Sequence, residues 1–165
     1  LTVASVLATG VFACALPFAA LAAATALNSD RSDGTLLLGT IWLTNQVIGF
    51  GFLGYPLEAQ AFAWGLAMGV GTLAAYVAAR AGVAAVAPYG VVAVIAVALP
   101  IAFLAYQAVL HAAGLLLPNG EGAVTYGVLA YVALVEAVAY IVLLTVHRLA
   151  VTAGWLAPNV GEGAV

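Results

Sequence analysis

Long runs of hydrophobic residues, separated by short polar segments, cover most of this chain. A transmembrane helix needs about 20 consecutive apolar residues, because the hydrocarbon core of a bilayer is about 30 Å thick. The runs are continuous rather than alternating, which is the helical pattern. The sequence therefore predicts an all-α, polytopic membrane protein with a single domain, a bundle of five transmembrane helices. The predicted spans cover residues 1–27, 35–54, 57–79, 86–117 and 124–148.

Charged and turn-forming residues mark the ends of these spans. Residues 28–34 form the most polar stretch of the chain, Arg80 follows the third span, and a Pro-Asn-Gly turn at 118–120 precedes the fifth. About 37 residues separate Arg80 from Pro118, which is too many for one upright span and too few for two. We therefore expect a single long helix there, tilted in the membrane and bent at Pro100.

The composition agrees with a membrane location. Hydrophobic residues make up 67 % of the 165 residues, and charged residues only 5 %. Soluble domains contain about 45–50 % apolar and about 25 % charged residues, so this surface is suited to lipid rather than water. Three arginines and no lysine are too few basic groups to bind nucleic acid through its phosphates. A single cysteine, Cys14, excludes an internal disulfide and a cysteine-based metal site.

All the basic residues fall on one side of the five predicted spans. Arg31 lies between the first and second spans, Arg80 follows the third, and Arg148 ends the fifth. The positive-inside rule places that side in the cytoplasm, with the N-terminus outside and the C-terminus inside. We expect a bacterial or archaeal cytoplasmic membrane, with the lipid bilayer as the main partner.

A polar cluster formed by Thr44, Asn45 and Gln46 lies near the centre of the second span. At 1.5 Å per residue, the two amides are expected near the membrane midplane, level with the middle of the third span. Small residues recur there at every fourth position, a pattern that favours close helix packing; they are Ala61, Gly65 and Gly69. Two interpretations follow. The amides line a solute or ion site, or they join the two helices by hydrogen bonds.

Glu136 is the one acidic residue placed deep within a predicted span. An ionised carboxylate is costly in lipid, so this side chain should be neutral, paired or directed into a wet cavity. Tyr140 follows one turn later on the same helix face. Both should lie opposite Pro100, whose ring leaves the carbonyl of Ala96 without its helical hydrogen bond. Glu136 is therefore either a proton or cation site, or a protonated group that satisfies this carbonyl.

Gln107 and His111 share one face of the fourth predicted span. Gln107 is a further candidate for solute binding, and His111 is a possible isolated ligand. His147 differs from His111 in membrane depth by about 25–30 Å, counted along the two helices from their shared turn. The two histidines therefore cannot bind one haem within a monomer, and the sequence identifies no cofactor.

The residue types that would indicate an enzyme are not gathered in one place. The glycines at 49, 51 and 54 match a dinucleotide-binding pattern, but they lie inside a predicted membrane helix, where that motif has neither its strand nor water. The acids and histidines are spread over different depths, so we do not expect catalysis.

Two classes of function remain. The polar groups near the midplane, together with prolines at 17 and 100 that break helices, favour a transporter of a small solute or ion, or the substrate-binding membrane subunit of one. The small size, the near absence of soluble loops and the small-residue stripe favour a non-catalytic structural or assembly subunit of a larger membrane complex. Other membrane subunits or a second copy of the chain are possible partners in either class.

Overall fold

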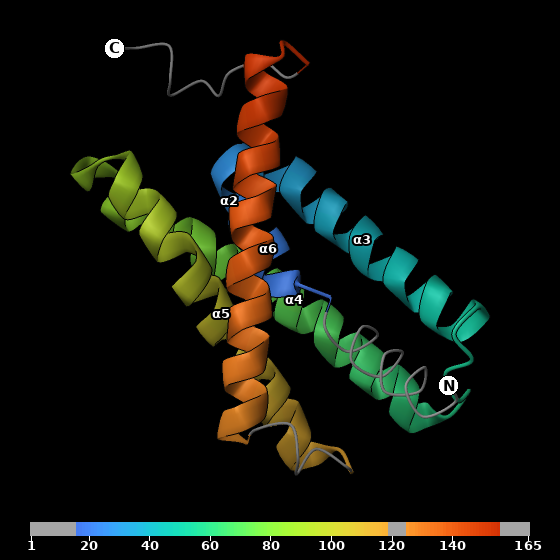
Figure 1. Ribbon diagram of the computed structural model, residues 1–165. Helices are drawn as coiled ribbons and strands as arrows, with labels where there is room; N and C mark the ends of the chain where they lie inside the picture. Colours follow the sequence, from blue (N-terminus) through green and yellow to red (C-terminus); the bar gives the residue numbers. More distant parts are fainter. Residues whose placement is uncertain (1–15, 119–124, 156–165) are drawn as a thin grey trace.

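The computed structural model describes residues 16–118 and 125–155, and all regular structure in this part of the chain is helical. Figure 1 shows the helices crossing one another, with α6 in front of the others. The elements are α2 (Phe18–Asn28), α3 (Arg31–Gly51), α4 (Ala59–Val86), the 3-10 helix η1 (Ala87–Tyr89), α5 (Val91–Leu116) and α6 (Tyr126–Thr152). The expected all-α class is confirmed.

Three of the described helices are long and apolar enough to cross a membrane. They are the 31-residue segment formed by α4 and η1, the 26-residue α5 and the 27-residue α6. The predicted count of five spans is not confirmed. α2 has only 11 residues, and residues 1–15 of the first predicted span lie outside the described residues. α3 has 21 residues, but side chains such as Arg31, Asp33 and Gln46 make it more polar than the other three.

The short helix α2 lies at the centre of the bundle. It packs against α3, α4, α5 and α6, and in Figure 1 it is seen behind α6, where the other helices cross. Five of its buried residues are alanines, whose small side chains let the neighbouring backbones approach closely. The buried residues of α2 are Phe18, Ala19, Ala20, Ala22, Ala23, Thr25 and Ala26.

The most extensive helix contact joins α4 and α5. Gly90, with a φ of +93°, follows η1 and reverses the chain between them. The sequence also predicts a tight hairpin of the second and third spans, and the corresponding helices α3 and α4 do contact each other, although less extensively than α4 and α5. Between α3 and α4, however, the side chains of Gln46 and Trp42 fill the space over Gly65 and Gly69, so the backbones stay further apart. A predicted hairpin of the fourth and fifth spans is replaced by a small contact of α5 with α6, because α6 packs more extensively on α2.

Arg80 does not end its helix. The third predicted span stops at residue 79, whereas α4 continues to Val86. The Arg80 side chain binds protein groups, so its charge does not need to end the helix. Its Nη1 donates hydrogen bonds to the carbonyl of Ser29 at 2.7 Å and to the hydroxyl of Tyr76 at 3.3 Å. Tyr76 in turn donates to the carbonyl of Asp30 at 3.1 Å. The fourth helix starts at residue 91 instead of 86, because η1 and Gly90 occupy the intervening positions.

The polar segment 28–34 is mostly helical. Only Ser29 and Asp30 separate α2 from α3, and the next three residues form the first turn of α3. Asp33 is favourable in that turn because negative charge is stabilised at a helix N-terminus. Gly34 is buried against the ring of Tyr76, where a β-carbon would collide with the tyrosine side chain. This close contact brings the start of α3 against α4.

α5 is one continuous helix through Pro100, which agrees with the single helix predicted there but not with a break of the helix at Pro100. A proline has no N–H, so the carbonyl of Ala96, four residues earlier, lacks its usual helical donor. The adjacent carbonyl of Ile95 accepts a hydrogen bond from the hydroxyl of Tyr140 at 3.0 Å. Tyr140 therefore ties α6 to α5 next to the proline.

Candidate functional site

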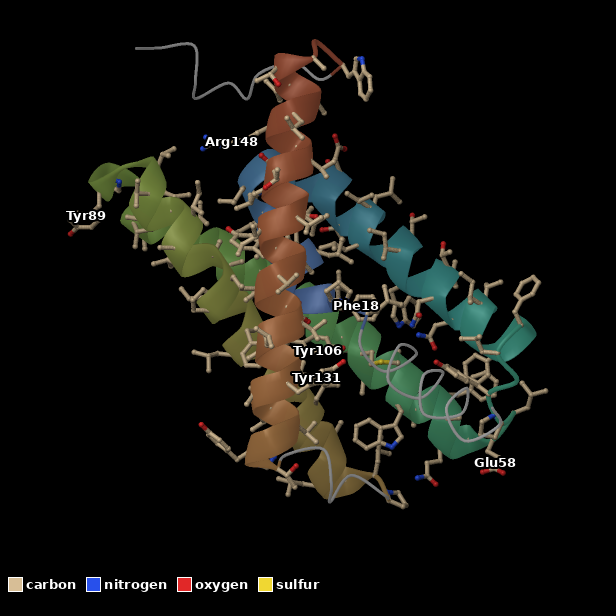
Figure 2. The ribbon with its side chains drawn as sticks, in the orientation of Figure 1. Phe18, Glu58, Tyr89, Tyr106, Tyr131 and Arg148 are labelled. Carbon is tan, nitrogen blue, oxygen red and sulfur yellow. The ribbon has the colours of Figure 1, made fainter. Side chains whose placement is uncertain are left out.

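A cavity of about 620 Å³ lies among α3, α4, α5 and α6. Cavities of about 300–1,000 Å³ are typical of small-molecule binding sites. Tyr106, labelled in Figure 2, belongs to its wall and marks its level in the bundle. The other polar or aromatic lining side chains are Gln46 of α3, Tyr55, Trp64 of α4, Gln107 and His111 of α5, and Glu136 of α6.

Aliphatic side chains form most of the remaining wall. Those on α6 recur at intervals of one or three residues and place one face of that helix against the cavity. A cavity with such a wall favours a ligand that is mostly apolar and is oriented by a few polar contacts. The larger aliphatic lining residues are Leu16, Met68, Leu104, Leu110, Val128, Leu129, Val132 and Val135.

Glu136 is almost completely buried, with 2 % of its surface exposed. One carboxylate oxygen accepts a hydrogen bond from the backbone N–H of Ala19 at 3.2 Å, and the other accepts one from Ala20 at 2.6 Å. These N–H groups belong to the first turn of α2, where backbone donors have no partner within the helix. Pro17, which precedes α2, provides no side-chain cap. The carboxylate of α6 therefore supplies the acceptors that α2 lacks.

Opposite charges hold the two ends of α2. The carboxylate of Glu136 lies at its N-terminus, and the guanidinium of Arg80 binds the carbonyl of Ser29 just after its C-terminus. A helix has a partial positive charge at its N-terminus and a partial negative charge at its C-terminus, so both contacts are favourable. In surroundings that are largely apolar, these two side chains fix the position of a helix that is too short to span the bilayer.

Gln46 differs from Glu136 in having an unsatisfied group. Its Nε2 atom is buried and has no hydrogen-bond partner among the described residues. Its Oε1 atom lies over Gly65, in the space that a β-carbon would occupy. One turn earlier on α3, Trp42 donates from Nε1 to the carbonyl of Gly65 at 2.8 Å. A buried donor without an acceptor is costly, so the Nε2 group of Gln46 is a hydrogen-bond donor left unused at the cavity wall.

The structure brings together part of the predicted site. Thr44 does not line the cavity; it is exposed and donates to the carbonyl of Thr40 within α3 at 2.8 Å. Asn45 and Tyr140 are buried but do not belong to the wall. The predicted residues that do line the cavity are Gln46, Gln107, His111 and Glu136, together with Ala61 and Gly65 of the small-residue stripe.

Of the two alternatives for Glu136, the link to the carbonyl freed by Pro100 does not occur. Both carboxylate oxygens of Glu136 bind α2 instead, and Tyr140 is the side chain that reaches α5. The chemistry of the partners explains the difference. The N–H groups of Ala19 and Ala20 match a carboxylate, which only accepts hydrogen bonds, whereas a carbonyl would require a protonated acid.

Two features of the site are missing from the sequence-based prediction. The first is the contact of Glu136 with α2, for which Pro17 is the available signal, because prolines favour helix starts and the next N–H groups need acceptors. The second is the position of Trp64 in the cavity wall. Its Nε1 donates to the carbonyl of Pro118 at 3.4 Å, and Gln60 Nε2 donates to the same oxygen at 2.8 Å. These bonds tie the end of α5 to α4 beside the cavity.

Comparison of the chain with protein-family models, with curated proteins and with solved structures gives no match. Function has therefore to be inferred from the cavity and its surroundings.

Proposed function

We propose that the protein binds a small solute inside the membrane, as a transporter or as the substrate-binding membrane subunit of one. One observation carries this proposal: Gln46, Gln107 and Glu136, from three different helices, line a single cavity. Polar side chains are costly in a membrane, and they gather where the protein handles a polar group. The cavity volume of about 620 Å³ is appropriate for such a ligand.

The short helix α2 also supports transport. Its 11 residues extend about 16 Å, roughly half the thickness of the hydrocarbon core. Leu16 and Glu136, at its N-terminal end, both line the cavity. Transporter sites are commonly formed by helices that end within the membrane, where their termini are close to the solute. The N-terminal end of α2 likewise lies next to the cavity.

Glu136 connects the cavity to α2 in this proposal. As a carboxylate it accepts the N–H groups of Ala19 and Ala20. Uptake of a proton would convert one of the accepting oxygens into a hydroxyl, which is a donor and a weaker acceptor for an N–H group. Proton transfer to Glu136 and the position of α2 would thus be coupled, as a proton-dependent transporter requires.

Native mass spectrometry after purification in mild detergent tests the proposal. The wild-type protein is expected to carry a bound small molecule. The variant Val132→Trp, which fills the cavity from α6, is expected to lose at least nine-tenths of this occupancy. The matched variant Leu134→Trp should retain it, because Leu134 is on the same helix but is 63 % exposed and outside the cavity wall. Equal occupancy in both variants, or none in the wild type, would contradict the proposal.

The same native mass spectra test the alternative that the protein is a structural subunit of a larger complex. Apolar side chains cover the outer faces of α6, among them Val138, Ile141 and Val142, which are more than half exposed. Such a surface suits lipid or another membrane chain. Co-purification of other protein subunits at fixed stoichiometry, without any effect of Val132→Trp, would favour a non-catalytic subunit of a larger complex.

A further inference from the structure

We infer that the cavity takes a neutral, mostly apolar molecule with a hydrogen-bond-accepting oxygen, such as a ketone or quinone, and that this molecule enters from the acyl-chain region of the bilayer. The inference rests on the proposed function and names its ligand class. It excludes inorganic ions and hydrophilic solutes as the principal ligand. Three observations lead to it: the state of Glu136, the state of Gln46, and the composition of the rim.

The charge of Glu136 is already balanced within the protein. Both carboxylate oxygens accept backbone N–H groups, and the positive end of the α2 dipole lies against them. A cation in the cavity would have to compete with these fixed donors, and an anion would meet the carboxylate itself. His111, which also lines the cavity, is exposed rather than buried. A charged ligand would therefore lose its hydration and would meet no counter-ion on the described wall other than this carboxylate, which already accepts two N–H groups.

Gln46 defines the polar group that the ligand needs. Its buried Nε2 is a donor without a partner among the described residues. Its Oε1 faces Gly65 on α4, so the group left to interact is the N–H. A carbonyl or ether oxygen of a ligand would accept this hydrogen bond, while the rest of the ligand would contact the aliphatic wall.

The rim of the cavity consists of exposed apolar residues. Leu104 is 67 % exposed and Val128 is 43 % exposed, yet both line the cavity, as does the exposed Ala108. Leu104 and Ala108 belong to α5 and Val128 to α6, two helices that are apolar enough to span a membrane. In a bilayer these side chains contact acyl chains, so a lipid-soluble molecule can enter sideways without crossing a polar surface.

Photolabelling with benzophenones tests this inference, because the reactive group is itself an apolar ketone. The protein is reconstituted in lipid nanodiscs and irradiated with benzophenone, with a benzophenone carboxylate or with a trimethylammonium benzophenone. We expect saturable labelling of the cavity wall, at Met68 or on residues 128–135 of α6, by the neutral probe. The two charged probes should bind at least tenfold more weakly.

Two variants of α3 test the role of the Gln46 donor. Gln46→Leu removes the donor but keeps a side chain of similar size, and it should weaken binding of the neutral probe about tenfold, the loss of one buried hydrogen bond. Thr44→Val is the matched control, because Thr44 is exposed and its hydroxyl is bonded within α3. Unchanged binding in Gln46→Leu would overturn the proposed acceptor.

The outcomes separate this inference from the proposed function. Labelling of the cavity wall by a charged probe at equal or higher affinity would overturn the ligand class, while leaving the cavity as a solute site. Absence of saturable labelling by any of the three probes, together with no bound molecule in the native mass spectrum, would overturn both.

Discussion

Glu136 provides from a distant helix what a helix usually obtains from its own N-cap residue. Serine, threonine, aspartate and asparagine are the common N-caps, because their side-chain oxygens accept the first free N–H groups. α2 is preceded by Pro17, which has no such oxygen, and its first turn is buried away from water. The carboxylate of Glu136, 116 residues after Ala20, accepts the N–H of Ala20 instead. The buried acid therefore stabilises the first turn of α2 and also lines the cavity.

Replacement of Glu136 by glutamine should destabilise the protein by about 1–3 kcal/mol, the cost of leaving a buried donor unsatisfied. The amide keeps one accepting oxygen, but its NH₂ group faces the N–H of Ala19 or Ala20, and two donors cannot bind each other. Denaturant unfolding in detergent micelles, followed by circular dichroism, measures the change.

Glu58→Gln is the control for this substitution. Glu58 is an exposed acid that precedes α4 and makes no side-chain cap, so its replacement should change the unfolding free energy by less than about 0.5 kcal/mol. Equal stability of the two variants would contradict a stabilising contact between Glu136 and α2.

The candidate site is partly predictable, because the cost of polar groups in lipid selects Gln46, Gln107 and Glu136, which line one cavity; their binding of a solute stays a prediction. The same reasoning also selects Thr44 and Asn45, which do not line the cavity. Neighbouring residues in a helix differ in direction by about 100°, so three consecutive polar residues cannot share one face. Only the packing of α3 shows which of them is directed at the cavity.

The helices themselves follow from the apolar runs, whereas their ends do not. Arg80 and the charged residues at 31–33 resemble membrane boundaries in the sequence, yet Arg80 lies inside α4 and residues 31–33 inside α3. Arg80 binds the α2–α3 turn, so its charge is satisfied by the protein. A sequence pattern cannot distinguish an arginine in contact with lipid headgroups from one in contact with a carbonyl.

A matched pair of glycine substitutions examines the contact of α3 with α4. In Gly69→Ala, the new β-carbon would lie 2.7 Å from the ring of Trp42, so the two helices must separate, at a cost of about 1–3 kcal/mol. In Gly39→Ala, the β-carbon meets nothing within 4 Å, and alanine is the better helix former by about 1 kcal/mol.

Thermal unfolding in detergent should therefore show a lower midpoint for Gly69→Ala and an unchanged or higher midpoint for Gly39→Ala. A stabilised Gly69→Ala would mean that α3 does not pack on α4 as described.

The arrangement of the helices is less predictable than their existence. Counting residues back from each turn assumes that consecutive helices pair along their length, which suits α4 and α5. It is wrong for α6, which packs more on α2 than on α5. The reason is chemical: α2 offers unsatisfied N–H groups, and α6 carries the one buried carboxylate among the described residues. The hydrophobic patterns of consecutive helices do not predict a contact between the first and the last described helix.

The orientation in the membrane is still a prediction, and the bundle provides a direct test. In Figure 2, Arg148 and Glu58 lie toward opposite ends of the molecule. The positive-inside rule places the Arg148 end in the cytoplasm. After replacement of Cys14 by alanine, Glu58→Cys should react with an impermeant maleimide added to intact cells, and Asp33→Cys should react only after lysis. Labelling of Asp33→Cys in intact cells would reverse the orientation.

The sequence separation of Glu136 and α2 has a consequence for biosynthesis. A ribosome adds about 5–20 residues per second, so the 117 positions between Ala19 and Glu136 take about 6–23 s to synthesise. During that interval the first turn of α2 has been made while the acceptor for its N–H groups does not yet exist. The central helix of the bundle can reach its final environment only when the last described helix arrives. An emerging chain that stops before residue 136 would therefore expose an incomplete centre, which a membrane quality-control protease or chaperone could recognise.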